Sequence, residues 1–146
     1  MSELRFFHAP FEQLTLMQLH DVFWLRNEVF VVGQKITSEP EVDGLDPQCV
    51  HVVGVDETGR TVATARLFMD ADPIKVGRIA VARDLQGRGL GTELMHYVHA
   101  VMNGRPGAMS AQDYLRKWYA SLGWIADSDV YDEAGIPHVH MSRPGI

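Results

Sequence analysis

The sequence predicts a mixed α/β fold in which helices cover both faces of a central sheet. Three observations indicate this: short apolar runs of strand-like composition, apolar residues spaced three and four apart, and a glycine-rich turn between a strand and a helix. With 146 residues, of which 46% are hydrophobic, the chain is long enough to bury a core. Residues 1–146 are therefore interpreted as one domain.

Helices and strands are expected to alternate along the chain. Thr15 and Gln18 have the spacing of a capping box at the start of an apolar stripe, so a helix is expected over 15–30. Residues 33–48 contain two Pro, two Gly and four acids, and they are expected to form a surface loop near a site. The remaining elements are expected to be a hairpin (49–55 and 61–69), a strand (75–81), a helix (90 to about 103), a short strand (108–111), a helix (114–122) and two last strands (124–130 and 138–142). This order is typical of a mixed sheet with helices on its faces.

Composition argues against several classes of partner. The 13 Lys and Arg residues form no basic block and the net charge is −6, so nucleic acid is not expected, whereas a cationic amine would be attracted. No apolar run is long enough for a membrane span, and residues 1–5 lack the pattern of a signal peptide. Cys49 is the only cysteine, which favours a reducing cytoplasm and a core position over a nucleophilic role.

The segment Gln86-Gly87-Arg88-Gly89-Leu90-Gly91 joins the strand to the next helix and is the strongest functional signal. Free amides and the helix dipole at such a start bind anions, and glycines let a phosphate approach the backbone. No Gly-Lys pair exists for a P-loop, and glycines at 87, 89 and 91 do not fit the dinucleotide fingerprint. They match the coenzyme A pyrophosphate loop, Q/R-x-x-G-x-G/A.

Several motifs together resemble the GNAT superfamily of N-acetyltransferases, and within it the ElaA-like branch, over nearly the whole chain. They are the glycine loop with Gly77-Arg78-Ile79-Ala80-Val81 before it, Arg26-x-x-Val29-Phe30-Val31-Val32-x-Gln34, Trp118-Tyr119-x-x-x-Gly123-Trp124 and Gly135-Ile136-Pro137-His138. The resemblance implies a mostly antiparallel sheet splayed at the cofactor strand, acetyl-CoA as cosubstrate, no metal and, by analogy alone, a homodimer. Gly33 departs from the branch, which usually has Glu there.

The resemblance also implies which residues hold coenzyme A. The strand before the loop would bind the pantetheine arm through its backbone, and the loop amides would bind the pyrophosphate. Gln112 stands where the family often has Asn. The implied cofactor residues are Ile79, Ala80, Val81, Gln86, Gly87, Arg88, Gly89, Leu90, Gly91, Thr92 and Gln112.

Tyr119 matches the family's usual general acid, because a phenol with a pKa near ~10 can protonate a departing thiolate. The alternative is a core tyrosine, since Tyr119 lies on the apolar stripe of its helix. For the general base His138 is the first choice, because imidazole titrates near neutrality. The other candidates are His51, Glu39, Glu41, Asp43 and a chain of waters.

Each remaining polar candidate has an ordinary structural alternative. His138 could be a strand-end residue bonded to a backbone carbonyl, and with His140 it could suggest metal, although no third ligand is indicated. Arg26 and Arg66 interrupt apolar runs, so they are expected to snorkel or to form ion pairs, or else to bind a substrate carboxylate.

The sequence therefore predicts an N-acetyltransferase in which a primary amine attacks acetyl-CoA directly in a ternary complex. The alternative is a non-catalytic acyl-CoA-binding or regulatory module. The acceptor stays open among protein N-termini, lysines, polyamines and drugs.

Overall fold

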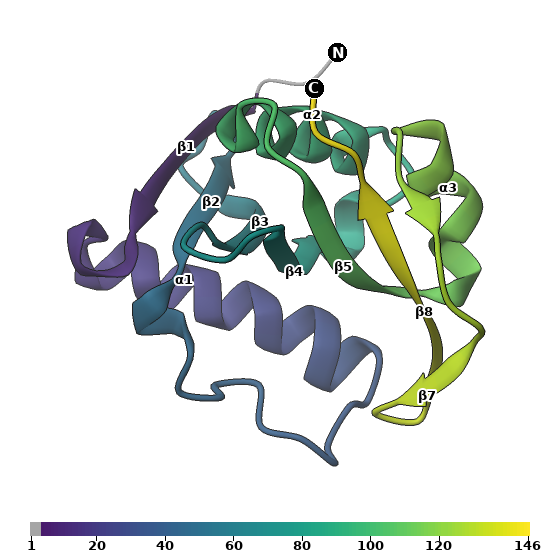
Figure 1. Cartoon of the computed structure of the whole chain (residues 1–146). Helices are drawn as coiled ribbons and strands as arrows, with labels where there is room; N and C mark the ends of the chain where they lie inside the picture. Colours follow the sequence, from purple (N-terminus) through teal and green to yellow (C-terminus); the bar gives the residue numbers. More distant parts are fainter. Residues whose placement is uncertain (1–3) are drawn as a thin grey trace.

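The computed structural model describes residues 4–146, whose strands form one eight-stranded sheet in the order β1-β2-β3-β4-β5-β8-β6, with β7 paired to β8 (Figure 1). The strands are β1 (Arg5–Pro10), β2 (Val50–Val55), β3 (Thr61–Phe68), β4 (Ile74–Val81), β5 (Gly107–Gln112), β6 (Ile125–Ala126), β7 (Tyr131–Glu133) and β8 (Ile136–Arg143). The helices are α1 (Leu16–Arg26), α2 (Leu90–Met102) and α3 (Arg116–Ser121). Short helical turns are η1 (Phe11–Gln13), η2 (Asn27–Gly33), η3 (Asp46–Gln48), η4 (Arg83–Leu85) and η5 (Asp113–Leu115). Within the described part of the chain, no helix is long and apolar enough to cross a bilayer.

The first helix begins at the predicted capping box. The Gln18 amide donates to Thr15 Oγ1 at 3.1 Å, and the Thr15 amide donates to Gln18 Oε1 at 2.9 Å. The helix does not end near residue 30. It widens into the π-helical turn η2, and the Gln34 amide then donates to the Val29 carbonyl five residues back. The helical segment therefore continues to Gly33, and the loop predicted from residue 33 begins directly after it.

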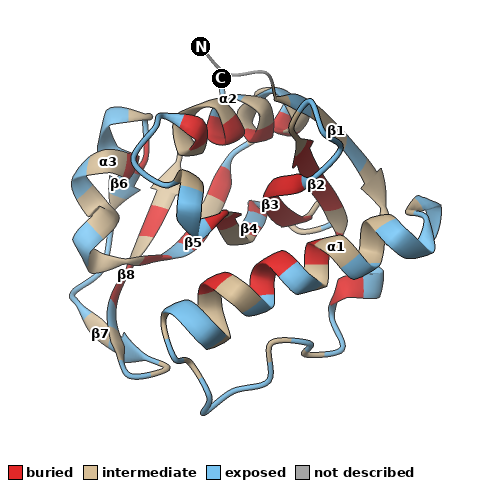
Figure 2. Cartoon of the chain, turned by 180° about the vertical axis from the view of Figure 1, so that it is seen from behind, coloured by how far each residue is buried: buried red, intermediate tan, exposed pale blue. Residues whose placement is uncertain are grey.

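The sheet separates two apolar layers. Val62 of β3 packs in a cluster with Leu25 and Val29 on the α1 side, whereas its neighbour Ala63 packs in a cluster with Leu94 on the α2 side. Successive side chains of a strand point to opposite faces, so α1 and α2 must cover opposite faces. Figure 2 shows the sheet between α1 and α2, with buried residues along both helices. The predicted arrangement of helices on both faces is confirmed.

The sheet is splayed between β4 and β5. All other strand pairs are antiparallel, whereas β4 and β5 pair in parallel only at Ile74↔Gly107 and Lys75↔Ala108. On its other side, β4 carries a bulge, and Arg78 within that bulge has φ of 50°. The mostly antiparallel sheet splayed at the strand before the glycine loop is confirmed.

Three expectations about the strands were wrong: two strands were not predicted and one was predicted too long. β1 was not predicted, because this edge strand is exposed or half-buried throughout and shows no alternating apolar pattern. β7 was also not predicted, since 132–137 was assigned to a loop between strands, although β7 and β8 form a tight hairpin across it. The strand expected over 124–130 is reduced to β6, because Trp124 is buried in the core before it and only Ile125 and Ala126 pair with β8.

Candidate active site

A cavity of about 810 Å³ lies where β4 and β5 separate. Among the described residues, its walls come from β4, the glycine loop, the start of α2, β5, α3, the loop after η2 and the β7–β8 hairpin. The predicted site residues that line it are Ile79, Ala80, Val81, Gln86, Gly87, Gly89, Leu90, Gly91, Thr92, Gln112, Tyr119 and His138. Arg88 is exposed and is not part of the lining, so its predicted contact would have to form from the rim. The fold thus brings the donor and catalytic candidates together.

The glycine loop presents backbone amides to one end of the cavity. Gly87 and Gly89 have φ of 79° and 81°, the left-handed region that favours glycine, and a Cβ at either would meet no atom within 4 Å. Gly89 is the N-cap of α2, so the amides of Leu90, Gly91 and Thr92 have no carbonyl partner within the helix. These amides, at the positive end of the helix dipole, suit a pyrophosphate.

Contacts to neighbouring elements hold this loop in position. Gln86 Nε2 donates to the Val81 carbonyl at 3.0 Å, so that carbonyl already has a partner in this structure. Trp118 of α3 donates from Nε1 to Thr92 Oγ1 at 3.2 Å. The same indole would lie only 3.2 Å from a Cβ at Gly91, which explains the third glycine by packing rather than by φ. The loop is therefore tied to β4 on one side and to α3 on the other.

The bulge in β4 leaves part of its backbone without a strand partner. In the described residues, Gly77 pairs with Arg66 and Ala80 with Thr64, while Arg78 and Ile79 between them have no register partner on β3 or on β5. A φ of 50° at Arg78 costs free energy that neighbouring contacts must offset. Ion pairs of its guanidinium, described below, supply those contacts. This unpaired stretch is where an extended arm can bind like an added strand.

Tyr119 lies on α3 with only 4% of its surface exposed, and it lines the cavity while packing in the main core cluster. Tyr119 is therefore both a core residue, as the structural alternative expected, and a residue of the cavity wall, as a general acid must be. Burial raises the pKa of its phenol, so the hydroxyl stays protonated at neutral pH. Within residues 4–146 the hydroxyl makes no hydrogen bond, which leaves its proton available to a group in the cavity.

His138 lies on β8, is 5% exposed and lines the cavity. Its Nδ1 is 2.7 Å from the Ile136 carbonyl oxygen. Because a carbonyl only accepts hydrogen bonds, Nδ1 must carry the proton, and Nε2 of the neutral ring then holds a lone pair. The backbone contact proposed as the ordinary alternative is present, and it leaves Nε2 suited to accept a proton.

The other candidate bases are less suited to proton transfer. His51 is fully buried outside the cavity lining, its Nε2 lies 3.0 Å from the Asp46 carbonyl, and burial lowers its pKa. Glu39 lines the cavity but is exposed. Glu41 and Asp43 also line it, but guanidinium groups engage both of them. His138 therefore stays the first choice.

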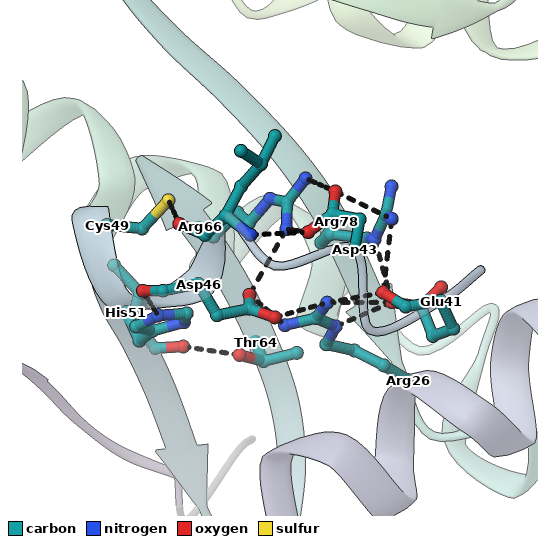
Figure 3. Close-up of polar contacts among 11 residues, drawn as sticks. Arg26, Glu41, Asp43, Asp46, Cys49, His51, Thr64, Arg66 and Arg78 are labelled. Carbon is teal, nitrogen blue, oxygen red and sulfur yellow. Dashed lines mark hydrogen bonds and ion pairs between the residues drawn. The ribbon is translucent and has the colours of Figure 1, made fainter. Parts of the chain in front are cut away.

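Six charged side chains form a closed cycle beside the cavity, which we call the charge ring (Figure 3). Its members are Arg26, Glu41, Arg78, Asp43, Arg66 and Asp46. Around the ring, the ion-pair distances are 2.8 Å (Arg26–Glu41), 2.7 Å (Glu41–Arg78), 3.4 Å (Arg78–Asp43), 2.6 Å (Asp43–Arg66), 3.1 Å (Arg66–Asp46) and 2.8 Å (Asp46–Arg26). Arg26 and Arg66 are thus ion-paired, which the sequence analysis gave as one of the expected roles for them.

The acidic and basic members of the ring come from different parts of the chain. Its three carboxylates all come from 41–46, within the loop and η3, and its three guanidiniums come from α1, β3 and β4. A hydrogen bond from Arg66 is the main cause that holds the pKa of Asp43 far below its usual range. Burial alone would raise the pKa of Asp46, but hydrogen bonds from Arg26 and Arg66 lower it overall. The ring therefore fastens the loop to the sheet in its ionised form.

Two side-chain amides form a reciprocal hydrogen-bonded pair at the cavity wall. Gln34 Nε2 donates to Gln112 Oε1 at 3.1 Å, and Gln112 Nε2 donates back to Gln34 Oε1 at 2.9 Å. Gln34 follows η2, and Gln112 ends β5. The residue expected to reach the cofactor is thus held by a partner from the opposite wall.

Sequence reasoning missed Glu133, which lines the cavity beside His138. Its Oε2 lies 3.5 Å from His138 Nε2. The sequence shows only an Asp-Glu pair before a turn, and the hairpin register, which pairs Glu133 with Ile136, was not predicted. Cys49 is confirmed as a core residue, because it is 1% exposed and burial raises the pKa of its thiol to about 11.

Comparison with known proteins places these features in a family. Residues 33–143 match the family model of the acetyltransferase (GNAT) domain. A UPF0039 protein of Schizosaccharomyces pombe is 36% identical over 147 residues, with 97% of each chain covered. Protein ElaA of Escherichia coli is 33% identical over 92% of each chain, and its crystal structure superposes with a TM-score of 0.87 over 96% of this chain and 99% of that one. An acyl-CoA N-acyltransferase from Pseudomonas aeruginosa is similar to the same degree, with a TM-score of 0.86, 33% identity and coverage of 96% and 99%.

Proposed function

This chain belongs to the GNAT acetyltransferase family, and we propose that it transfers an acetyl group from acetyl-CoA to a primary amine by direct attack in a ternary complex. One observation carries the proposal: the cavity joins the unpaired stretch of β4, the free amides at the start of α2 and the buried Tyr119 hydroxyl. An anion site, a backbone edge and a proton donor are what a long acyl thioester with a pyrophosphate needs.

The residues present fit coenzyme A. The amides of Leu90, Gly91 and Thr92 would hold its pyrophosphate, and the backbone of Arg78 and Ile79 its extended arm. Acetyl-CoA supplies an activated thioester carbonyl when bound. The amine nitrogen forms the new C–N bond as the C–S bond breaks.

Two protons must move in this reaction. His138 Nε2 takes the proton that the amine loses, because an alkylammonium with a pKa near ~10.4 is not nucleophilic. Tyr119 gives its proton to the departing thiolate, and its raised pKa keeps the phenol protonated until then. Exchange with solvent restores both groups.

Acetyl-CoA binding is the first test. A ligand that binds only the folded state stabilises it by about 2.7 kcal/mol at a hundred times its Kd, which predicts a rise in Tm of roughly 5–10 °C. NADH serves as a control, because it contains a pyrophosphate but lacks the pantetheine arm. No shift with saturating acetyl-CoA would contradict the proposal.

Turnover is the second test. A panel of amines is offered with acetyl-CoA, and release of the free thiol is measured. This assay distinguishes an enzyme from a binding module. Binding without transfer to any amine would favour the non-catalytic acyl-CoA-binding module instead.

We also propose a location, a range of partners and an oligomeric state for the protein. We propose a cytoplasmic protein without nucleic-acid partners, which the buried, unpaired Cys49 and the net charge of −6 support. A homodimer is proposed by analogy alone, and light scattering of the purified protein tests it.

A further inference from the structure

We propose that Glu133 and His138 form the subsite that receives the acceptor's ammonium group, so that the acceptor is an aliphatic primary amine. This inference rests on the function proposed above and names the substrate class of the same site. It follows from how the β7–β8 hairpin arranges two hydrogen-bond acceptors at the cavity.

The hairpin sets both groups by its register. Ala134 and Gly135 at the turn have φ of 55° and 79°, the paired left-handed conformation of a tight hairpin turn. Glu133 then pairs with Ile136, whose carbonyl oxygen accepts from His138 Nδ1 at 2.7 Å. With Nδ1 occupied, His138 Nε2 faces Glu133 Oε2 at 3.5 Å.

Further contacts fix each member of this pair. Ser110 Oγ, from β5, donates to Glu133 Oε1 at 3.0 Å, which leaves Oε2 as the oxygen near the imidazole. The Tyr131 ring stacks on His138, with centroids 6.3 Å apart and 25° between the planes, and its hydroxyl lies 2.5 Å from Ser110 Oγ. The carboxylate and the imidazole therefore stand in a defined geometry before any substrate binds.

When the His138 ring is neutral with its proton on Nδ1, Nε2 and Glu133 Oε2 are two acceptors that face each other, and the described residues place no donor between them. A cationic N–H group satisfies both at once, and an alkylammonium offers three such donors. Glu133 would bind the charge, and Nε2 would accept one proton to leave a nucleophilic amine. A neutral hydroxyl or an uncharged arylamine lacks the charge that this arrangement selects.

The other carboxylates of the cavity are less suited to this role. Glu41 and Asp43 each bridge two guanidiniums of the charge ring. Glu39 is exposed and makes no contact with His138 in the described part of the chain. Glu133 is 47% exposed at its side chain, so the remainder of an amine bound there can extend to solvent.

The experiment titrates n-butylammonium into the full chain, with and without coenzyme A, and follows the His138 ring by NMR. We expect a saturable shift in the wild type, none with n-butanol, and a dissociation constant at least about tenfold higher in Glu133→Gln. Asp132→Asn is the matched control, because its carboxylate is on the same strand and, among residues 4–146, accepts only from the Gly135 amide at the turn. It should keep the wild-type dissociation constant.

Equal affinity in the wild type and Glu133→Gln, or no saturable shift in the wild type, would overturn the subsite. Gln can still accept from Ser110, and a Tm close to wild type confirms that the variant is folded. The titration without coenzyme A does not depend on the donor site. Failure of acetyl-CoA to bind would thus count against the proposed function and leave the amine subsite to be judged on its own titration.

Discussion

The two ends of the cavity are built from different parts of the polypeptide. At the end proposed to bind the acyl donor, which we call the donor end, backbone amides of the glycine loop and an unpaired stretch of β4 form the surface, and side chains mainly pack behind them. At the end proposed to bind the amine, which we call the acceptor end, side chains form it: the charge ring, the Gln34–Gln112 pair and the Glu133–His138 pair. Backbone groups are present at every position, so a backbone site needs only the right conformation. A side-chain site needs particular residues from distant segments.

This difference predicts how each end responds to substitution. The donor end should be sensitive to changes that alter φ or occupy the space over the amides. The acceptor end should be sensitive to loss of a single charge or amide.

Gly89→Asp should abolish binding of acetyl-CoA, with a rise in Kd of at least about 1,000-fold, equivalent to about 4 kcal/mol. The substitution places a negative charge beside the α2 amides and a Cβ at a φ of 81°. Calorimetric titration with acetyl-CoA measures the effect. Gly59→Asp is the control, since Gly59 has φ of 86° and equal open space but lies in the β2–β3 turn. Similar Kd values for the two variants would show that the donor end is not at this loop.

Asp46→Asn should lower the free energy of unfolding by about 3 kcal/mol, because it leaves Arg26 and Arg66 buried without full charge compensation. Urea unfolding measures the change. Asp84→Asn removes the carboxylate of an exposed ion pair with Arg60 and should leave stability unchanged within error. If the two variants unfolded alike, the ring would be no more than a surface feature.

Lowering the pH should reduce the contribution of the charge ring to the free energy of unfolding. The pKa values of Asp43 and Asp46 are lower in the folded protein than in the unfolded chain, so the unfolded chain binds more protons in acid. Their stabilisation is complete well above the unfolded carboxyl pKa of ~3.9 and is lost as the pH falls through the lower folded values. Unfolding curves at pH 7, 4 and 3 should therefore fall less steeply for Asp46→Asn than for the wild type. Parallel curves would contradict this.

Tyr119→Phe should lower kcat about 100-fold, equivalent to about 2.7 kcal/mol, while the Kd for acetyl-CoA changes less than twofold. The phenyl ring keeps the packing of a side chain that is 4% exposed and removes only the proton donor. Tyr97→Phe is the control, because it removes a hydroxyl that hydrogen-bonds His8 and does not line the cavity. Steady-state kinetics with free-thiol detection separates the two, and unchanged turnover in Tyr119→Phe would exclude it as the acid.

Gln112→Ala should have the smallest effect, about 1 kcal/mol in stability, and Gln34→Ala should match it because each residue leaves the other amide without its partner. The two variants also locate the boundary between the ends. If Gln112 contacts the cofactor, only Gln112→Ala will raise the Kd for acetyl-CoA. Equal Kd values in both variants would assign Gln112 to the acceptor end.

The same contrast explains what the sequence could predict. The glycine loop has a fixed spacing over Gln86–Gly91, and its position between strand and helix follows from local patterns alone. The predicted capping box at Thr15 and the two-faced sheet are likewise confirmed by short-range contacts and by strand alternation. Such features depend on residues a few positions apart, so their physics is visible in one window of sequence.

The acceptor end could not be predicted in this way. The charge ring joins α1, the loop, β3 and β4, and although the apolar runs around Arg26 and Arg66 indicated ion pairs, nothing in the local sequence identified their partners. The pairing of Glu133 with His138 depends on a hairpin register, and β7 is a strand of only three residues. Three-dimensional proximity of distant segments, rather than local pattern, determines these contacts.

The division of charge in the ring makes the loop comparable to a tethered anionic ligand. The helix and the sheet place three guanidiniums close together, and the loop supplies the counterions for them from the same chain. Because the tether is short, the effective concentration of this internal ligand is high, and docking needs no external anion. The same loop also forms part of the cavity wall, so the segment that neutralises the three arginines is the one that lines the proposed acceptor end.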